Sequence, residues 1–310
     1  MQDQVTPFEP DLAELPKGEW LTRLAQTAEE HGFFQPLGRK HFAAHVRRGD
    51  TLIVTFESVQ GMRVLTERAE PLGWSMVRDN DWSHLCIASD GDTWFRDRHV
   101  IGLFDQMIDD GFFDDFETVL FYGAGPCGYA AAAYSVAAPG AQVLVIQPQA
   151  TLDPRVTEWD ERFIEMRRTD FTSRYGYAPD MLDAAERAHV FYDPREPLDA
   201  MHAALFTRPN VVKHRMRFMG DALQTDLLEM NLWDDLLRAV ADDRLSTRSF
   251  ARMLRARRDH DPYLTNLLNT LTTEGRDGLA RLLCRNVTDR MSAPHFSKHL
   301  AALEAGNADD

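Results

Sequence analysis

The residues best suited to chemistry lie in one short turn, Gly123-Ala124-Gly125-Pro126-Cys127-Gly128. The three glycines have the G-x-G-x-x-G spacing, in which backbone N–H groups at the start of a helix can hold a phosphate. Cys127 adds a thiol where a helix is expected to begin, a position that can lower the pKa of a thiol. The turn is therefore a candidate for anion binding or for thiol chemistry, and packing of small residues is the alternative for both.

The segments around this turn predict how it is positioned. An apolar run at 119–122 precedes it, and an alanine-rich stretch at 129–138 and a second apolar run at 142–146 follow it. This order predicts strand, helix and strand, the βαβ unit of a parallel sheet. Because ligands bind at the carboxyl ends of such strands, the turn is the expected site.

The rest of the chain alternates in the same way. Further strands are expected at 51–56, 82–88, 189–192 and 210–213, with helical patterns between them. The expected fold is α/β, a mostly parallel sheet of about six strands with helices on both faces. We divide the chain into an N-terminal helical cap at 1–48, with helices at 17–31 and 41–48, an α/β core at 49–222 and a helical C-terminal region at 223–310. Within the core, 155–168 and 179–188 also have helical patterns.

Ligand-binding residues are expected at the ends of two strands. Glu57 and Ser58 follow the first strand of the core, and the turn follows the third. The carboxyl ends of parallel strands meet at one edge of the sheet. The expected ligand-binding set is Glu57, Ser58, Gly123, Gly125, Pro126, Cys127 and Gly128.

From about residue 51 to 221 the chain resembles the α/β-hydrolase superfamily. A bacterial branch of that family has the pattern Y-G-x-S-x-G-G-Y-A-A at the turn that carries its nucleophile, followed by P-G-A and P-Q. The matching residues here are Tyr122-Gly123-Ala124-Gly125-Pro126-Cys127-Gly128-Tyr129-Ala130-Ala131, Pro139-Gly140-Ala141 and Pro148-Gln149. The resemblance implies that the nucleophile, acid and histidine positions are Gly125, Asp193 and Asp221.

The chain departs from the family at the positions that carry catalysis. Gly125 has no nucleophilic side chain, and Pro126 has no backbone N–H for the oxyanion hole. Asp221 stands where the histidine is expected. Since one missing oxyanion donor alone costs roughly two to three orders of magnitude in rate, ordinary serine hydrolysis is not expected. Cys127 could act in its place only with a base, for which His202 and His214 are the candidates.

The resemblance therefore implies a catalytically degenerate α/β-hydrolase-like protein that binds a small ligand or a protein partner and needs no cofactor. One alternative is a dinucleotide-binding oxidoreductase that holds FAD or NAD(P) through Gly123, Gly125 and Gly128. Against this, the strand after the turn ends in Gln147, where a ribose-binding acid is expected.

A second alternative comes from a resemblance of the whole chain. It is similar to bacterial proteins often labelled phosphoadenosine phosphosulfate reductase, which would imply a sulfonucleotide reductase. Those reductases have an S-G-G-x-D-S phosphate loop and a C-terminal E-C-G motif, and this chain has neither. Its Cys284 lies in a helical pattern instead.

The charge composition indicates which classes of binding partner to expect. A net charge of −15 argues against general nucleic-acid binding. The segment 244–300, however, contains eleven basic and five acidic residues. Within it, Arg248, Arg252 and Arg255 recur at helical spacing and are followed by Arg257 and Arg258. This basic face is either solvated or contacts an acidic partner or a phosphate ligand.

The remaining features predict location and metal content. No run of about 18 apolar residues is present, so no membrane span is expected. Three separated cysteines indicate reduced thiols and a cytoplasmic protein. His84 and Cys86 alternate on one expected strand, and we interpret them as core residues; no metal is expected. The oligomeric state is left open.

Overall fold

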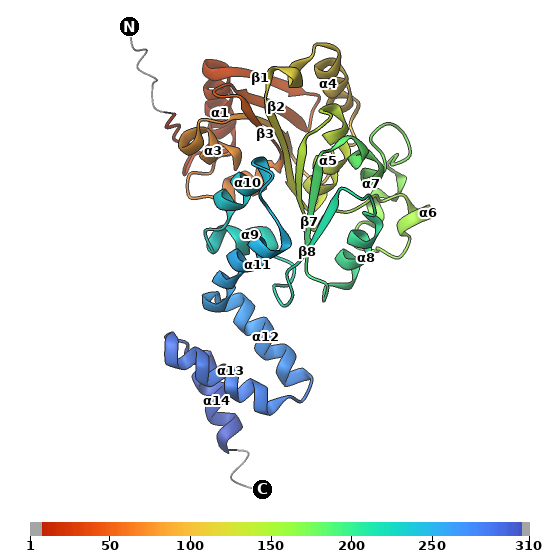
Figure 1. Cartoon of the computed structure of the whole chain (residues 1–310). Coiled ribbons are helices and arrows are strands. Elements are labelled where there is room, and N and C mark those ends of the chain that lie inside the picture. Colours follow the sequence, from red (N-terminus) through yellow and green to blue (C-terminus); the bar gives the residue numbers. More distant parts are fainter. Residues whose placement is uncertain (1–7, 306–310) are drawn as a thin grey trace.

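Eight strands form one sheet in the computed structural model, which describes residues 8–305 (Figure 1). The order is β1-β2-β4-β3-β5-β6-β7-β8. The six strands from β4 to β8 are parallel, whereas β2 pairs antiparallel with both β1 and β4. The fold is therefore α/β with a mostly parallel sheet, as predicted. The strands are β1 Gly32–Leu37, β2 His41–Val46, β3 Thr51–Ser58, β4 Ser83–Ser89, β5 Thr118–Ala124, β6 Gln142–Ile146, β7 Arg187–Tyr192 and β8 Val211–Arg215.

The prediction for the N-terminal segment is partly wrong. Helix α1 (Lys17–His31) has the predicted bounds, but β1 and β2 follow it, so the helix predicted at 41–48 is a strand. Every residue of β2 is buried. A short run buried on both faces has no alternation that separates a strand from a helix, and only its pairing with β1 and β4 reveals it. Residues 32–46 thus belong to the sheet rather than to a helical cap, whose first seven residues lie outside the described part.

Helices α4 (Arg98–Asp109), α5 (Pro126–Tyr134) and α8 (Pro197–Leu205) cover one face of the sheet. Alternate residues of β3, Leu52, Val54 and Phe56, point to this face. The alanines at 130–133 in α5 are all fully buried. Their small side chains let α5 lie close against β5 and β6, and this close packing fixes the turn between β5 and α5.

The opposite face has two apolar clusters. One lies under α1, α2 (Val59–Leu65) and α3 (Gly73–Asn80), beside β2 and β4. The other joins Ile53, Tyr122 and Ile146 to α9 (Leu223–Glu229), α10 (Trp233–Ala241) and α11 (Thr247–Met253). Residues 223–254 of the predicted C-terminal region therefore cover the sheet of the core.

The last three helices have an apolar core of their own. They are α12 (Asp261–Thr273), α13 (Asp277–Arg290) and α14 (Pro294–Ala305). Leu268, Cys284 and Phe296 are buried in their shared cluster. In Figure 1 these helices extend away from the sheet toward the C-terminus. The helical character predicted for this region is confirmed up to residue 305, where the description ends, and none of the described helices is long and apolar enough to cross a membrane.

The segment between β6 and β7 contains less helix than predicted. In place of the helices predicted at 155–168 and 179–188, it has the short helices α6 (Pro154–Thr157) and α7 (Ala178–Met181) and two 3-10 turns. Aspartates explain part of the difference, because Asp160 Oδ1 accepts from the N–H of Arg162 and Asp170 Oδ1 from that of Thr172. Such local bonds compete with a helix.

Candidate functional site

The turn between β5 and α5 is a sharp strand-to-helix turn with Gly125 at its corner, the position that the family resemblance predicts for a nucleophile elbow. Gly125 has φ 55° and ψ −124°, a conformation that residues with a side chain rarely adopt. Its N–H donates to the carbonyl O of Ile146 at 2.8 Å, and its carbonyl accepts from the N–H of Tyr129 at 3.0 Å. A Cβ added at Gly125 would meet no atom within 4 Å. The elbow thus has space for a side chain at the position where the sequence has none.

The other two glycines of the turn are required by packing. A Cβ at Gly123 would overlap the carbonyl group of Cys127 in the first turn of α5. A Cβ at Gly128 would lie 3.1 Å from the carbonyl O of Gly123 and 3.2 Å from that of Ile146. Close contact between α5 and the sheet therefore accounts for both glycines without a bound phosphate.

A cavity of about 170 Å³ lies beside the elbow, where β3, β4 and β5 end. We call it the elbow cavity. Of the predicted ligand-binding residues, Glu57, Ser58, Pro126 and Cys127 line it, whereas Gly123, Gly125 and Gly128 do not. Gly125 lies between the lining residues Ala124 and Pro126. The other lining residues are Phe56, Gly61, Met62, Leu65, Ser89, Gly91, Asp92, Thr93, Trp94, Phe95 and Gln224.

Neither of the two predicted vestigial acids lines this cavity. Asp193 follows β7 and is 1% exposed, and its Oδ2 accepts from the N–H of Gly220 at 2.9 Å. Its Oδ1 accepts from the N–H of Arg195 at 2.9 Å. Asp221 is exposed to solvent. The carboxylate of Asp193 therefore fixes the loop after β8, and among the residues described as lining the elbow cavity there is no histidine.

The environment of Cys127 disfavours its thiolate. Burial raises the pKa of the thiol well above its ordinary value, and the carboxylates of Glu57 and Asp92 raise it further. The two histidines considered as bases have other partners. His202 Nε2 lies 3.0 Å from Asp160 Oδ2, and His214 Nε2 lies 2.9 Å from His189 Nδ1. The geometry thus does not support the thiol hypothesis.

Alkylation of Cys127 is therefore expected to be slow. With iodoacetamide at about pH 7.5, the rate at this thiol should fall at least roughly tenfold below that of glutathione, because the thiolate fraction falls tenfold per pKa unit. Mass spectrometry of the native protein measures the modification, and Cys127→Ser identifies the peak. A rate above that of glutathione would contradict the raised pKa.

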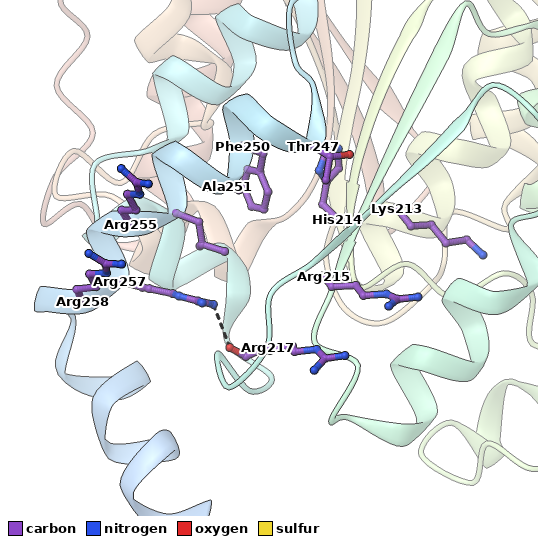
Figure 2. Close-up of a pocket in the computed structure, with 11 residues that line it drawn as sticks. Lys213, His214, Arg215, Arg217, Thr247, Phe250, Ala251, Arg255, Arg257 and Arg258 are labelled. Carbon is purple, nitrogen blue, oxygen red and sulfur yellow. Dashed lines mark hydrogen bonds between the residues drawn. The ribbon is translucent and has the colours of Figure 1, made fainter. Parts of the chain in front are cut away.

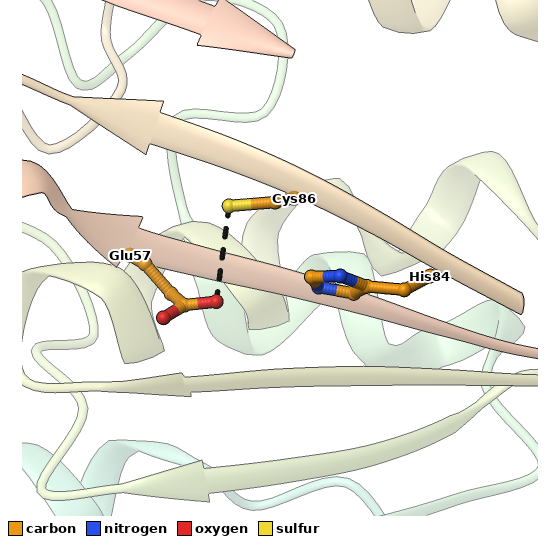
Figure 3. Close-up of side chains that lie close together, drawn as sticks. All are labelled: Glu57, His84 and Cys86. Atoms are coloured by element: carbon orange, nitrogen blue, oxygen red, sulfur yellow. Dashed lines mark hydrogen bonds between the residues drawn. The ribbon is translucent and has the colours of Figure 1, made fainter. Parts of the chain in front are cut away.

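Next to the elbow cavity, four buried polar side chains of β3 and β4 form a cluster. They lie on the face of the sheet that α1–α3 and α9–α11 cover. Thr55 Oγ1 donates to Glu57 Oε1 at 2.5 Å and lies 2.7 Å from His84 Nε2. The Cys86 thiol donates to Glu57 Oε1 at 3.7 Å (Figure 3). The backbone N–H of Leu72 donates to Glu57 Oε2 at 3.0 Å. These four side chains, Thr55, Glu57, His84 and Cys86, are the polar cluster.

Burial controls protonation in the polar cluster. It raises the pKa of Glu57 to about 7, although the hydrogen bonds from Thr55, Leu72 and Cys86 act in the opposite direction. It lowers the pKa of His84 to about 3, so the ring is neutral at physiological pH. Glu57 therefore changes charge near neutrality at the edge of the elbow cavity, as a general acid or base does.

The polar cluster also contains a possible ligand set for a metal. One ligand atom each from Glu57, His84 and Cys86 lies within 4.8 Å of the other two. A zinc site needs at least three such ligands. Glu57 Oε1 and His84 Nε2, however, are already within hydrogen-bond distance of Thr55 Oγ1. Asp226, Glu229 and His260 form a second, partly exposed group near α9. The absence of a metal stays a prediction.

Part of the site could not be found from single segments. Glu57 meets His84 and Cys86 because β3 and β4 pair in parallel, with Thr55 opposite Cys86. The sequence indicated that His84 and Cys86 share one face of β4, but not that Glu57 of β3 lies beside them. Asp92 and Trp94 follow β4 directly in the turn that begins at Asp90, so their place at the carboxyl end of a strand was the available signal. Gln224 comes from α9, for which no such signal exists.

No protein-family model matches the chain, and no curated protein matches it. Among solved structures, an α/β-superfamily hydrolase from Oenococcus oeni PSU-1 has 11% identity and a TM-score of 0.44 over 65% of this chain and 96% of its own. Est1E from Butyrivibrio proteoclasticus has 11% identity and a TM-score of 0.42 over 67% and 98%. The capsule O-acetyltransferase of Neisseria meningitidis serogroup A has 10% identity and a TM-score of 0.40 over 65% and 91%. The mostly parallel eight-stranded sheet is consistent with an α/β-hydrolase-like fold.

Proposed function

We propose that this protein is a catalytically degenerate α/β-hydrolase-like protein that binds a small molecule in the elbow cavity instead of hydrolysing it. The observation that carries the proposal is Gly125. It has the strained elbow conformation and open space in front of it, yet no atom that can attack a substrate.

The surroundings of the elbow support the same conclusion. Pro126 is the first residue of α5 and has no N–H to offer a developing oxyanion. The Asp193 carboxylate is bonded to the N–H groups of Gly220 and Arg195 rather than to an imidazole. Nucleophile, base and one oxyanion donor are thus missing together.

The lining of the elbow cavity indicates the chemistry of the ligand. Glu57 and Asp92 are acidic, and no lysine or arginine is found in the lining that the structure describes. Trp94 and Phe95 add aromatic surface, and the Trp94 indole is held by a hydrogen bond to Gln149 Oε1 at 3.2 Å. The favoured ligand is therefore a small molecule with an amine or other hydrogen-bond donors.

The size of the elbow cavity bears on the dinucleotide alternative. Pockets for drug-sized ligands span about 300–1,000 Å³, and this cavity measures about 170 Å³. A dinucleotide would have to lie mostly outside it. Purified protein is therefore expected to be colourless, and Gly125→Ala should leave any affinity for NAD(P) or FAD unchanged.

A panel of p-nitrophenyl esters and thioesters should show no turnover above background. Gly125→Ser should fold, because its Oγ enters open space, and should stay inactive because Pro126 and Asp221 are unchanged. A catalytic serine alone cannot supply the base or the oxyanion donor. Steady-state hydrolysis assays of both proteins measure this outcome.

Cys127→Ser is the matched control for this panel. Ester turnover by the wild type that disappears in Cys127→Ser would contradict the proposal and restore the thiol mechanism. Ligand binding is tested by thermal shift with a panel of small primary and quaternary amines, and Asp92→Asn should weaken any hit. Hits among nicotinamide or flavin cofactors, lost in Gly125→Ala, would favour the dinucleotide alternative instead.

A further inference from the structure

A second cavity of about 590 Å³ lies at the opposite edge of the sheet from β1. Its walls are the edge strand β8 with the turn after it, and α11 with the 3-10 helix η5 (Leu254–Asp259). We call it the basic cavity. It shares no lining residue with the elbow cavity. The lining residues are Lys213, His214, Arg215, Arg217, Thr247, Phe250, Ala251, Leu254, Arg255, Arg257 and Arg258.

Six of these side chains are cationic, and the described lining contains no acid. Figure 2 shows the three arginines of η5 on one side, whereas Lys213 and Arg215 extend from β8 away from η5, and Lys213 Nζ donates to the carbonyl O of Ala204 in α8 at 3.5 Å. Arg257 reaches across and donates to the carbonyl O of Arg217 at 3.2 Å. None of these six cations forms an ion pair with a carboxylate of residues 8–305. In a chain with net charge −15, this local concentration of positive charge attracts anions.

The buried side chain of His214 also lines the basic cavity. His214 is 1% exposed, and its Nδ1 has no hydrogen-bond partner among the described residues. Its Nε2 lies 2.9 Å from His189 Nδ1. When His189 donates this bond, the neutral His214 ring carries its own proton on Nδ1 and offers it as a buried donor. Phe250 and Leu254 supply apolar surface beside it.

We propose that the basic cavity binds a small molecule with a di- or triphosphate group. The three arginines of η5 carry planar guanidinium groups, which bind phosphate oxygens through paired hydrogen bonds. The cavity is concave, and its volume falls within the usual range for small-molecule sites. An acidic polypeptide would meet the charge but would not fill the concave site or contact the buried His214.

The test uses isothermal titration calorimetry with inorganic tripolyphosphate on the full chain, at about 0.15 M salt. The wild type should bind one tripolyphosphate per chain. The double variant Arg255→Glu/Arg258→Glu should weaken the affinity by about tenfold or more, because each charge-assisted bond contributes at least that factor. Both side chains are exposed, and circular dichroism checks that the variant folds.

Arg248→Glu/Arg252→Glu is the matched control. It makes the same change in net charge on the same helical segment, but neither residue lines the cavity. Its effect should stay below about threefold, since charges exposed to solvent are screened. ATP binding at least as tightly as tripolyphosphate, with AMP weaker than both, would support the proposal and indicate a nucleotide as the source of the phosphates.

Three results would overturn the proposal. The first is no binding of tripolyphosphate or ATP by the wild type at about 1 mM, a concentration at which even a weak site binds. The second is equal weakening in both double variants, which would reduce the effect to overall charge. The third is tighter binding of a poly-glutamate peptide than of tripolyphosphate, which would make this face a surface for acidic polypeptides.

Discussion

Replacing Glu57 with Gln should remove a large part of the pH dependence of stability. Between about pH 5 and pH 8.5, the free energy of unfolding of Glu57→Gln should rise by about 2.5 kcal/mol relative to the wild type. The cause is the burial of the Glu57 carboxyl, which raises its pKa from 4.5 in the unfolded chain to about 7.

The sign follows from proton binding. Between the unfolded and the folded pKa, the folded protein holds the Glu57 proton more tightly than the unfolded chain does. The stabilising contribution of this group is therefore complete below pH 4.5 and is lost as the pH rises through about 7. Glutamine cannot ionise, so the variant keeps its stability over this range.

Urea unfolding at both pH values, followed by tryptophan fluorescence, measures the difference. Asp92→Asn is the control, because this carboxylate also lines the elbow cavity but is exposed. Its curve should run parallel to that of the wild type. If the Glu57→Gln curve also runs parallel, the carboxyl of Glu57 does not titrate in the folded protein.

A second large effect is expected at Gly123. Gly123→Ala should lower the free energy of unfolding by about 3 kcal/mol or more, because its Cβ overlaps backbone of α5 that cannot move without shifting the whole helix. The change also displaces the Gly125 elbow. Urea unfolding measures the loss, and near-UV circular dichroism reports whether the aromatic core is retained.

Gly125→Ala separates packing from ligand contact. It meets no neighbouring atom and should cost about 1–3 kcal/mol, from its backbone conformation alone. A dinucleotide site would give another pattern, with a loss of cofactor binding in Gly125→Ala. An equal loss of stability in both variants would contradict the packing role assigned to Gly123.

The fold was predictable where apolar runs alternate with helical patterns. The βαβ unit around Gly125 and the six parallel strands were expected, and β6 has the predicted bounds. The two N-terminal strands were missed because β2 is buried on both faces and contains alanine and histidine rather than a run of β-branched residues. Its structure depends on strands far along the chain, which a local pattern does not contain.

The site was predictable to the extent that it follows strand ends. Glu57, Ser58 and Cys127 come together because β3 and β5 are neighbours. The polar cluster was not predicted, since it depends on the register between β3 and β4. The basic face was visible as arginines at helical spacing, but half of the cations in the basic cavity come from β8 and the turn that follows it.

The separate core of α12–α14 has a consequence for how unfolding can be followed. All six tryptophans, at positions 20, 74, 82, 94, 159 and 233, precede these helices. Fluorescence therefore reports only on the sheet and the helices packed against it, whereas far-UV circular dichroism also detects α12–α14. Because these three helices bury their apolar residues mainly against one another, they can melt as an independent cooperative unit. Unfolding curves from the two methods need not coincide, and a single two-state free energy then describes only the fluorescent part of the protein.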